Sequence, residues 1–386
     1  MANLFTATAV QIRHVSSLYQ VYDLSGSSLQ LGLAGFFQAL PFVVFGLFAG
    51  ALADVLDRKR LILITQCLNL VPGLALALLT RTGAIQVWHI YLFSLTTSLV
   101  QVFSWPARSA IIPSLVPQSH LMNAVTLSTT IQQSSFLFGP VLAGMLIDRV
   151  GLDYTYFLES SLFVPSVLMI LAVRSSGKPE GAQGGVSLRG IIEGLRFIWI
   201  ERIILSLFLL DFGVTLVGFY RPILPIFARD VFNMGATGLG TLYAAPAVGA
   251  LLGSAALLLL GNVRRKGALA VIAAVFFAGS LALLGVSTWF WMAVVAVAAL
   301  GITDAISVTL RRTVVQFLAP DAMRGRASSL ITVFAQATNA LGALLAGAAA
   351  ALLGAPQALL AGGLLCVVIV FGISRSVPQL WRYRSD

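Results

Sequence analysis

Charge is scarce in this sequence. Asp, Glu, Lys and Arg together make up 10% of its 386 residues, whereas a soluble domain carries roughly a quarter. Hydrophobic residues make up 58% of the chain, and the mean hydropathy is +0.94. A water-soluble fold of this size could not cover its surface with so few charges. The composition therefore excludes an ordinary soluble protein and indicates a chain that is solvated by lipid.

Cysteine and histidine are scarce as well. Cys67 and Cys366 both lie in apolar runs, which excludes a disulfide framework and a cysteine-based metal site. The three histidines, His14, His89 and His120, show no catalytic spacing. The sequence contains no phosphate-binding Gly-x-x-x-x-Gly-Lys-Ser/Thr loop, so we do not expect it to hydrolyse ATP. We expect no catalytic residue, no cofactor and no metal, and a protein that is not an enzyme.

The net charge of +10 arises from 24 basic and 14 acidic residues. The basic residues form small clusters between apolar runs and no continuous stripe, so nucleic acid is not an expected partner. Nineteen of the 24 fall in the C-terminal tail or in loops on the side of the amino terminus. Because cytoplasmic loops are enriched in Lys and Arg, we expect a multi-pass protein of the cell (inner) membrane with both termini in the cytoplasm.

Apolar runs long enough to cross a membrane recur along the chain. A transmembrane helix needs about 20 apolar residues, and the runs between polar breaks predict an all-α membrane protein with twelve spans. The predicted spans are 3–22, 29–53, 61–80, 87–107, 124–148, 153–173, 203–228, 237–261, 267–287, 289–310, 327–353 and 356–374.

The two halves of the sequence resemble each other at an offset of 203 residues. All four glycines of Gly32–Gly50 recur at the same spacing in Gly235–Gly253. Each stretch ends in two glycines four residues apart, a step that lets helix backbones approach closely. The same offset relates Arg108 to Arg311 in a separate predicted helix. A constant offset across separated helices indicates an internal duplication.

The duplication predicts two six-helix halves, residues 1–173 and 202–386, the second ending in a short cytoplasmic tail. A polar cytoplasmic linker, residues 174–201, joins them, and its second part can form an amphipathic helix that lies on the membrane. Transporters built from repeats bind their substrate near the middle of the membrane, where the repeats meet. The architecture therefore indicates a transporter.

The charged turn after the second predicted span reads Gly50-x-x-x-Asp54-x-x-Asp57-Arg58-Lys59. It resembles the loop between helices 2 and 3 of the major facilitator superfamily, where the pattern is Gly-x-x-x-Asp-x-x-Gly-Arg-Lys/Arg. Asp57 departs from that pattern. Together with VYDLSGSS before this turn and PARSAIIPSLVP after the fourth span, it looks like the drug:proton antiporter branch that contains enterobactin exporters and macrolide-efflux proteins. The resemblance extends over essentially the whole chain and implies the major facilitator fold.

The resemblance implies that this turn is a cytoplasmic latch formed by Gly50, Asp54, Arg58 and Lys59. Asp54 would face the start of a helix in the second half, and Arg58 would help to hold the outward-open form closed on the inside. A carboxylate is favoured at a helix N-terminus in any protein. The alternative is that these charges only set the topology.

The fifth predicted span contains Gly139-Pro140 and Gly144, which resemble the Gly-Pro signature of superfamily antiporters. Proline removes a helix hydrogen bond and bends the helix, and small residues permit close packing. The motif favours efflux over uptake, although a bent and tightly packed helix can occur in any membrane protein. The family's arginine deep in helix 4 is missing, because Arg108 is placed at the cytoplasmic end of its span, where topology explains it.

Ionisable residues inside spans are costly and are therefore candidates for coupling or substrate binding. Asp304 and Asp211 are placed about 10 Å inside the cytoplasmic edge, where either can bind a proton reversibly. The alternative is a static ion pair, Asp304 with an arginine or Asp211 with Arg221. Arg13 can meet an acidic substrate or a counter-ion, whereas Glu159 is placed near the outer end of its span, where it is as readily solvated. Neutral polar candidates, which can line a cavity or hold helices together, are Gln38, Gln101 and Gln133.

These observations favour a secondary transporter that exports a siderophore-like or drug-like small molecule by alternating access, as a proton-driven antiporter. The expected partners are that small molecule and the lipid bilayer, and the expected oligomeric state is a monomer. Uptake, or flipping of lipids or lysolipids, is the alternative within transport. A membrane-embedded enzyme is the alternative from another class.

Overall fold

A computed structural model describes residues 1–173, 196–261, 263 and 265–377, without side-chain positions for residues 50–55 and 321–329. Within this described part the chain is helical and contains no strand. The predicted linker, 174–201, falls mainly outside it, and residues 196–200 at its end are helical.

Helices of the N-terminal part are long and closely spaced in sequence. Their bounds are α1 Ala2–Ser25, α2 Ser28–Val55, α3 Arg58–Arg81, α4 Val87–Leu115, α5 Leu121–Ser161 and α6 Phe163–Leu171, with a 3-10 turn, η1, at Gln118–His120. Those of the C-terminal part are α8 Arg202–Gly218, α10 Gly235–Leu260, α11 Lys266–Gly285, α12 Phe290–Leu318, α13 Asp321–Leu353 and α14 Ala355–Ser376. Between α8 and α10 lie the short elements η2 Arg221–Ile223, α9 Leu224–Ile226 and η3 Phe227–Val231.

Glycine in the left-handed conformation marks the points at which the chain changes direction. Gly26, with φ 60°, ends α1 and donates its N–H to the carbonyl of Tyr22. Gly151, with φ 87°, interrupts α5, and Gly354, with φ 84°, separates α13 from α14. Such φ values favour glycine because it has no Cβ. The break at Gly151 falls between the predicted spans 124–148 and 153–173.

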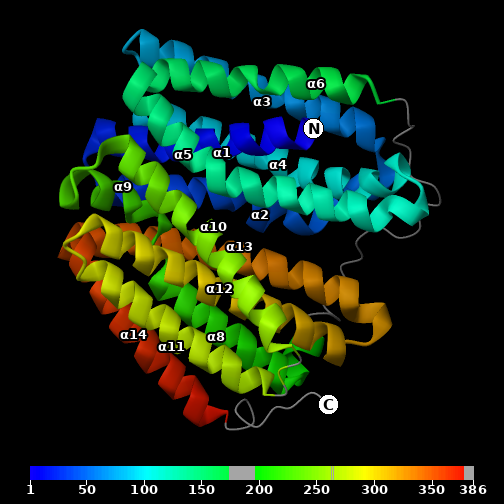
Figure 1. Ribbon diagram of the computed structural model, residues 1–386, viewed down its shortest axis with the longest axis vertical. Coiled ribbons are helices and arrows are strands. Elements are labelled where there is room, and N and C mark those ends of the chain that lie inside the picture. The colour runs from blue at the N-terminus through cyan, green and yellow to red at the C-terminus, as the bar shows by residue number, and fades with distance from the viewer. Residues whose placement is uncertain (174–195, 262, 264, 378–386) are drawn as a thin grey trace. The chain divides into compact units, whose positions relative to one another are not determined.

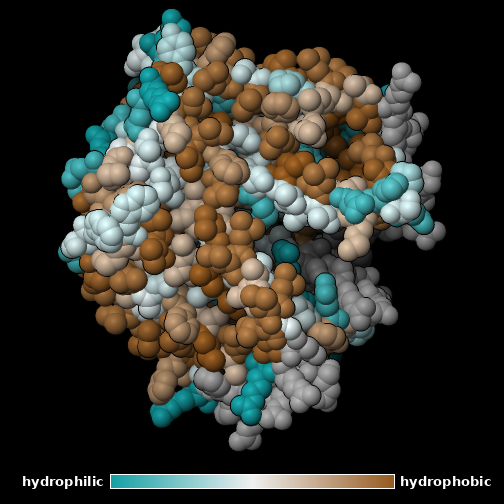
Figure 2. Space-filling model, in the orientation of Figure 1, coloured by the Kyte–Doolittle hydropathy of each residue, from teal (hydrophilic) through white to brown (hydrophobic). Residues whose placement is uncertain are grey.

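Nine helical segments within the described residues are long and apolar enough to cross a membrane. One of them, Gln118–Leu171, has 54 residues and contains the break at Gly151. Large apolar side chains are exposed on these helices, with Leu258, Leu259 and Leu352 each more than 80% exposed. The face drawn in Figure 2 is correspondingly dominated by hydrophobic residues. These features are those of a multi-pass membrane protein.

The chain divides into two compact units, and two helices contribute to both. Unit 1 contains α1, α3 to α6, the part of α2 from Phe37 onward, and Met234–Ala244, which holds the start of α10. Unit 2 contains α8, α11 to α14, Ser27–Phe36, which holds the start of α2, and the part of α10 from Ala245 onward. In unit 1, α1 packs against α5 and α3 packs against α4. In unit 2, α11 lies beside both α12 and α14 (Figure 1).

Close helix packing in unit 2 depends on the glycines of the repeated pattern. A Cβ at Gly253 would lie 2.6 Å from the carbonyl oxygen of Ile302, and one at Gly249 would overlap the carbonyl of Ala298. The expectation that this pair of glycines lets backbones approach closely is therefore confirmed for α10 and α12.

The helices α4 and α12 continue well past the C-terminal ends of their predicted spans. The apolar run predicted for α4 ends at 107 and that for α12 at 310, whereas the helices continue to Leu115 and Leu318. Arg108 and Arg311 consequently lie within helices and not in loops. This correction matters for the site, because both arginines are directed at other helices of their own units.

Candidate functional site

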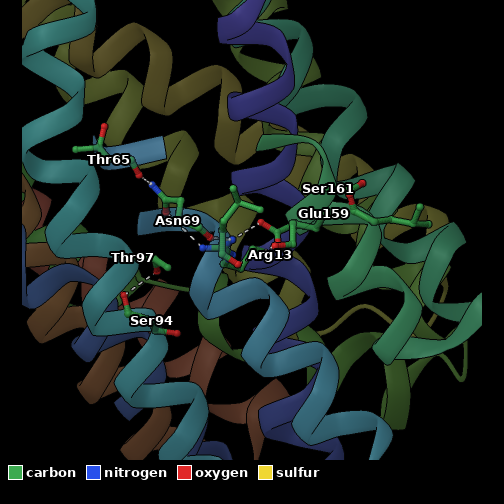
Figure 3. Close-up of polar contacts among 10 residues, drawn as sticks. Arg13, Thr65, Asn69, Ser94, Thr97, Glu159 and Ser161 are labelled. Atoms are coloured by element: carbon green, nitrogen blue, oxygen red, sulfur yellow. Dashed lines mark hydrogen bonds and ion pairs between the residues drawn. The ribbon is translucent and has the colours of Figure 1, made fainter. Parts of the chain in front are cut away.

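Arg13 and Glu159 form a buried ion pair in unit 1. Nη2 of Arg13 in α1 lies 2.6 Å from Oε1 of Glu159 in α5, and Figure 3 shows the two side chains directed toward each other. The same Nη2 donates to the main-chain oxygen of Asn69 in α3 at 2.7 Å. The guanidinium also lies over the ring of Phe163, 5.2 Å from its centroid. Partners from α3, α5 and α6 therefore surround the one cation of α1.

Glu159 is placed differently from the sequence-based expectation. It is fully buried, and it is not solvated at the outer end of its span. Room for its carboxylate comes from Gly73 in α3, where a Cβ would lie 2.7 Å from Oε2 of Glu159 and 3.0 Å from Nη2 of Arg13. Of the two partners considered for Arg13, the structure provides the counter-ion. Nothing in the sequence signals this pairing, because its members lie far apart along the chain.

A second membrane-embedded ion pair lies in unit 2. Asp211 in α8 pairs with Nη1 of Arg311 in α12. The alternative in which Asp211 pairs with Arg221 named the wrong arginine, because Arg311 had been assigned to a loop. Asp304 lies at the midpoint of α12, with 14 residues of helix on either side. Its side chain is exposed, and it has no ion pair within the described part of the chain.

An open cavity with both polar and apolar lining lies in unit 1. Its volume is about 180 Å³, and it is lined by residues of α1, α3, α4 and α5, among them Arg108, Gln101 and Gln132. Arg108 donates from Nη1 to Oδ1 of Asn3 at 2.8 Å, from Nε to Oγ of Ser104 at 2.9 Å, and from Nη2 to Oγ1 of Thr6 at 3.3 Å. Placing Arg108 at the helix end because of topology was wrong, since its side chain joins α4 to α1.

The remaining glutamine candidates lie apart from this cavity's lining. Gln38 in α2 forms a hydrogen bond between Nε2 and Nδ1 of His14 at 2.8 Å, and its carbonyl accepts from Ser98. Gln133 is half-buried on α5, next to the cavity-lining Gln132. Of the three predicted glutamines, the cavity therefore includes Gln101.

The charged turn between α2 and α3 is fixed by hydrogen bonds within unit 1. Asp57 caps α3 and accepts from the N–H of Arg60 at 3.1 Å, which gives its departure from glycine a structural reason. Arg58 donates to the carbonyl of Ala110 in α4 at 3.0 Å. Lys59 donates to the carbonyl of Val173 at 2.5 Å, beyond the end of α6. The other two latch candidates, Gly50 and Asp54, lie in α2 among the residues whose side chains are outside the described part.

The glycines of the α5 motif lie at close helix contacts. A Cβ at Gly139 would be 2.5 Å from Cβ of Gln11 in α1, and one at Gly144 would overlap the carbonyl of Ala236 in α10. Pro140 lies between them, inside the helix.

Asp148, one turn beyond Gly144, was not singled out from the sequence. Its Oδ2 accepts from the N–H of Thr237 at 2.8 Å and its Oδ1 accepts from the N–H of Ala236 at 3.3 Å. It therefore caps the start of α10. An acidic residue at the end of a predicted span can simply face water, so the sequence alone gives no indication of this contact.

Comparisons with known proteins agree with this architecture. The model of a family described as transmembrane secretion effector matches residues 1–382. The enterobactin exporter EntS of Shigella boydii is 25% identical over 385 residues, covering 100% of this chain and 92% of the relative. EntS of Escherichia coli is 24% identical with the same coverage.

Solved transporter structures share the fold. A bacterial homologue of the human lysosomal transporter Spinster, inward-facing and unoccupied, superposes with a TM-score of 0.78 at 15% identity, covering 100% of this chain and 96% of the other. A POT family transporter in complex with a thioalcohol-conjugated peptide has a TM-score of 0.78 at 12% identity, covering 98% and 96%. The expectation of a transporter and not an enzyme is confirmed. The match of a family model to nearly the whole sequence establishes that this chain belongs to the transmembrane secretion effector family of the major facilitator superfamily.

Proposed function

We propose that this chain is a proton-driven secondary transporter that exports a siderophore-like or drug-like small molecule across the bacterial inner membrane. The observation that carries the proposal is full-length similarity to relatives named as exporters of a small molecule. The proposal includes twelve spans in two six-helix halves, 1–173 and 202–386, both termini in the cytoplasm, and a monomer as the working unit.

The twelve spans follow from the nine apolar segments with three additions. The break at Gly151 divides Gln118–Leu171 into two passes, because 54 helical residues would extend about 80 Å and a bilayer core is about 30 Å thick. Two further helices, α1 with 24 residues and α4 with 29, are long enough to cross the membrane. Their buried polar residues give them a lower hydropathy than the other spans.

Alternating access requires helix contacts that can part and form again. Contacts at glycine are suited to this, because no side chains interlock between the two backbones. Gly144 of α5 meets α10 in unit 1, and Gly347 of α13 meets Gly32 of α2 in unit 2, where a Cβ would lie 2.7 Å from the opposing Cα. We propose that both contacts change during transport.

Asp304 is the proposed proton carrier. At the midpoint of a 29-residue helix it lies about 21 Å from either end. A carboxylate at that depth is costly unless it faces water or a partner, and its side chain is exposed without an ion pair in the described residues. By contrast, the carboxylate of Asp211 is engaged by Arg311, which makes it a less available proton acceptor.

Replacing Asp304 by asparagine is expected to abolish the response of export to a pH gradient, because the amide cannot carry a proton. The measurement is efflux of enterobactin, or of a compound found by thermal-shift screening, from proteoliposomes with and without an imposed gradient. Asp304→Glu is the matched control, since it keeps a carboxylate and should keep the response. Gradient-dependent export by the asparagine variant would exclude Asp304 as the sole carrier. Transport in the inward direction alone would favour uptake.

The latch remains part of the proposal. Arg58 and Lys59 hold the start of α3 against α4 and the end of α6, and the family resemblance assigns the latch carboxylate to Asp54. Asp54→Asn is expected to slow export while the protein stays folded and inserted, because it removes one charge and keeps the shape. Initial export rates in proteoliposomes measure this, with protein amounts matched by quantitative blotting. Equal rates for the variant and the wild type would leave the turn with a topological role alone.

A further inference from the structure

Two arginines occupy equivalent places in the two units but meet different partners. Arg108 in α4 and Arg311 in α12 are 203 positions apart, the offset of the sequence repeat. Each extends from its helix to the first helix of its own part of the chain. Nη1 of Arg311 pairs with the carboxylate of Asp211 in α8. Nη1 of Arg108 donates to the amide oxygen of Asn3 in α1 at 2.8 Å.

Asn3 and Asp211 are counterparts in the repeat, although the offset of 203 does not relate them. Gly139 contacts Gln11 of α1, and its repeat partner Gly342 contacts Phe219, directly after α8. Gln11 and Phe219 are 208 positions apart, and so are Asn3 and Asp211. The register of α1 against α8 thus differs by five residues from that of the other helices. An amide in unit 1 replaces the carboxylate of unit 2, with nearly the same size and shape.

Arg108 consequently lacks a charged partner. Its hydrogen bonds within the described part of the chain go to Asn3, Thr6 and Ser104, which are all neutral. A cation inside the membrane is costly unless a counter-charge or water compensates it. Unlike Arg13 and Arg311, each of which is paired with a carboxylate, Arg108 lines an open cavity.

The cavity combines one cationic side chain with amide and aromatic surface. Gln101 and Gln132 add amide groups to the lining, and Trp105 and Phe136 add aromatic surface. A guanidinium presents parallel N–H donors that match the two oxygens of a carboxylate. We infer that Arg108 binds an anionic oxygen group of the transported molecule, a carboxylate or an oxyanion of similar size, and that Asn3 keeps the arginine positioned while leaving its charge free for that group. This inference rests on the proposed function and names the substrate class.

The test compares benzoate with neutral benzamide, which has the same shape, by calorimetry on the purified full chain in detergent. Wild type is expected to bind benzoate at least about tenfold more tightly than benzamide, because a hydrogen bond to a charged group is the stronger one. Asn3→Asp supplies an internal counter-charge and should remove this preference, as should Arg108→Gln. Asn3→Ala removes the positioning hydrogen bond without adding charge, so it should weaken benzoate binding while benzoate stays the tighter of the two probes.

Two results would overturn the inference: equal or undetectable binding of both probes by wild type, or an unchanged preference for benzoate in Asn3→Asp. Equilibrium binding needs neither a gradient nor transport, so its failure is distinguishable from failure of the proposed function. If the protein exports in response to a gradient but shows no preference for benzoate, the proposed function stands and the anion site is excluded. If the protein prefers benzoate but exports no compound, the anion site stands and the proposed function is excluded.

Discussion

Replacing Glu159 by glutamine is expected to destabilise the protein by about 3–5 kcal/mol, because it leaves the charge of Arg13 buried without its counter-ion. The pair is enclosed: Glu159 is fully buried and Arg13 is 6% exposed. The remaining contacts of the guanidinium would be Asn69 and the ring of Phe163, which are both neutral. The midpoint of thermal unfolding in detergent should fall by roughly 6–20 °C, if unit 1 unfolds like a domain of about 150–250 residues, for which 1 kcal/mol corresponds to about 2–4 °C.

The double variant Glu159→Gln with Arg13→Met provides the control. It removes both charges and leaves a side chain of similar length over Phe163, so most of the lost stability should return. Replacing a buried ion pair by neutral groups is often close to neutral in stability, whereas removing one member is not. If the single and double variants unfolded at the same temperature, the unpaired charge would not be the cause of the loss.

Much of the fold could be predicted because lipid limits the choices of the chain. A segment that crosses a bilayer must be helical and apolar for about 20 residues, so the apolar runs mark the helices well. The turn at Gly151 lies where the sequence places a gap between spans. The constant offset of 203 likewise predicts the close approach at Gly249 and Gly253.

The helix ends could not be predicted in the same way. An apolar run sets the minimum length of a helix, and polar residues can continue it wherever another helix satisfies their side chains. The helix α4 continues through Arg108 because Asn3, Thr6 and Ser104 accept its hydrogen bonds. The helix α12 continues through Arg311 because Asp211 pairs with it. If such an arginine is assigned to a loop, its contacts with other helices are not considered, and the site is missed.

The residue pairs at the site could not be predicted from the sequence either. Arg13 and Glu159 lie in α1 and α5, and only the folded unit brings them together. The correspondence between Asn3 and Asp211 is hidden by a change of register, because the chain from Asp211 to Gly235 is five residues shorter than the chain from Asn3 to Gly32. A search at one fixed offset therefore aligns Asp211 with the wrong residue of α1.

Adding a methyl group at Gly144 is expected to destabilise the packing of α10 on α5. The new Cβ would overlap the carbonyl of Ala236 and would lie 2.9 Å from Cα of Thr237. Both neighbours are backbone atoms at the start of a helix that Asp148 holds by two hydrogen bonds, so neither can move aside without breaking that cap. Overpacking of this kind costs about 1–3 kcal/mol, and the rigid surroundings place Gly144→Ala at the upper end.

The matched control is Gly279→Ala in α11, where a Cβ would meet nothing within 4 Å. Because alanine favours a helix over glycine by about 1 kcal/mol, this variant should be unchanged or slightly more stable. Thermal unfolding in detergent and export from proteoliposomes measure the two variants side by side. We expect Gly144→Ala to unfold at a lower temperature and to export more slowly, since the strained contact lies between helices proposed to part and meet again in each cycle. If both variants behaved alike, Gly144 would be a helix residue without a role in the contact.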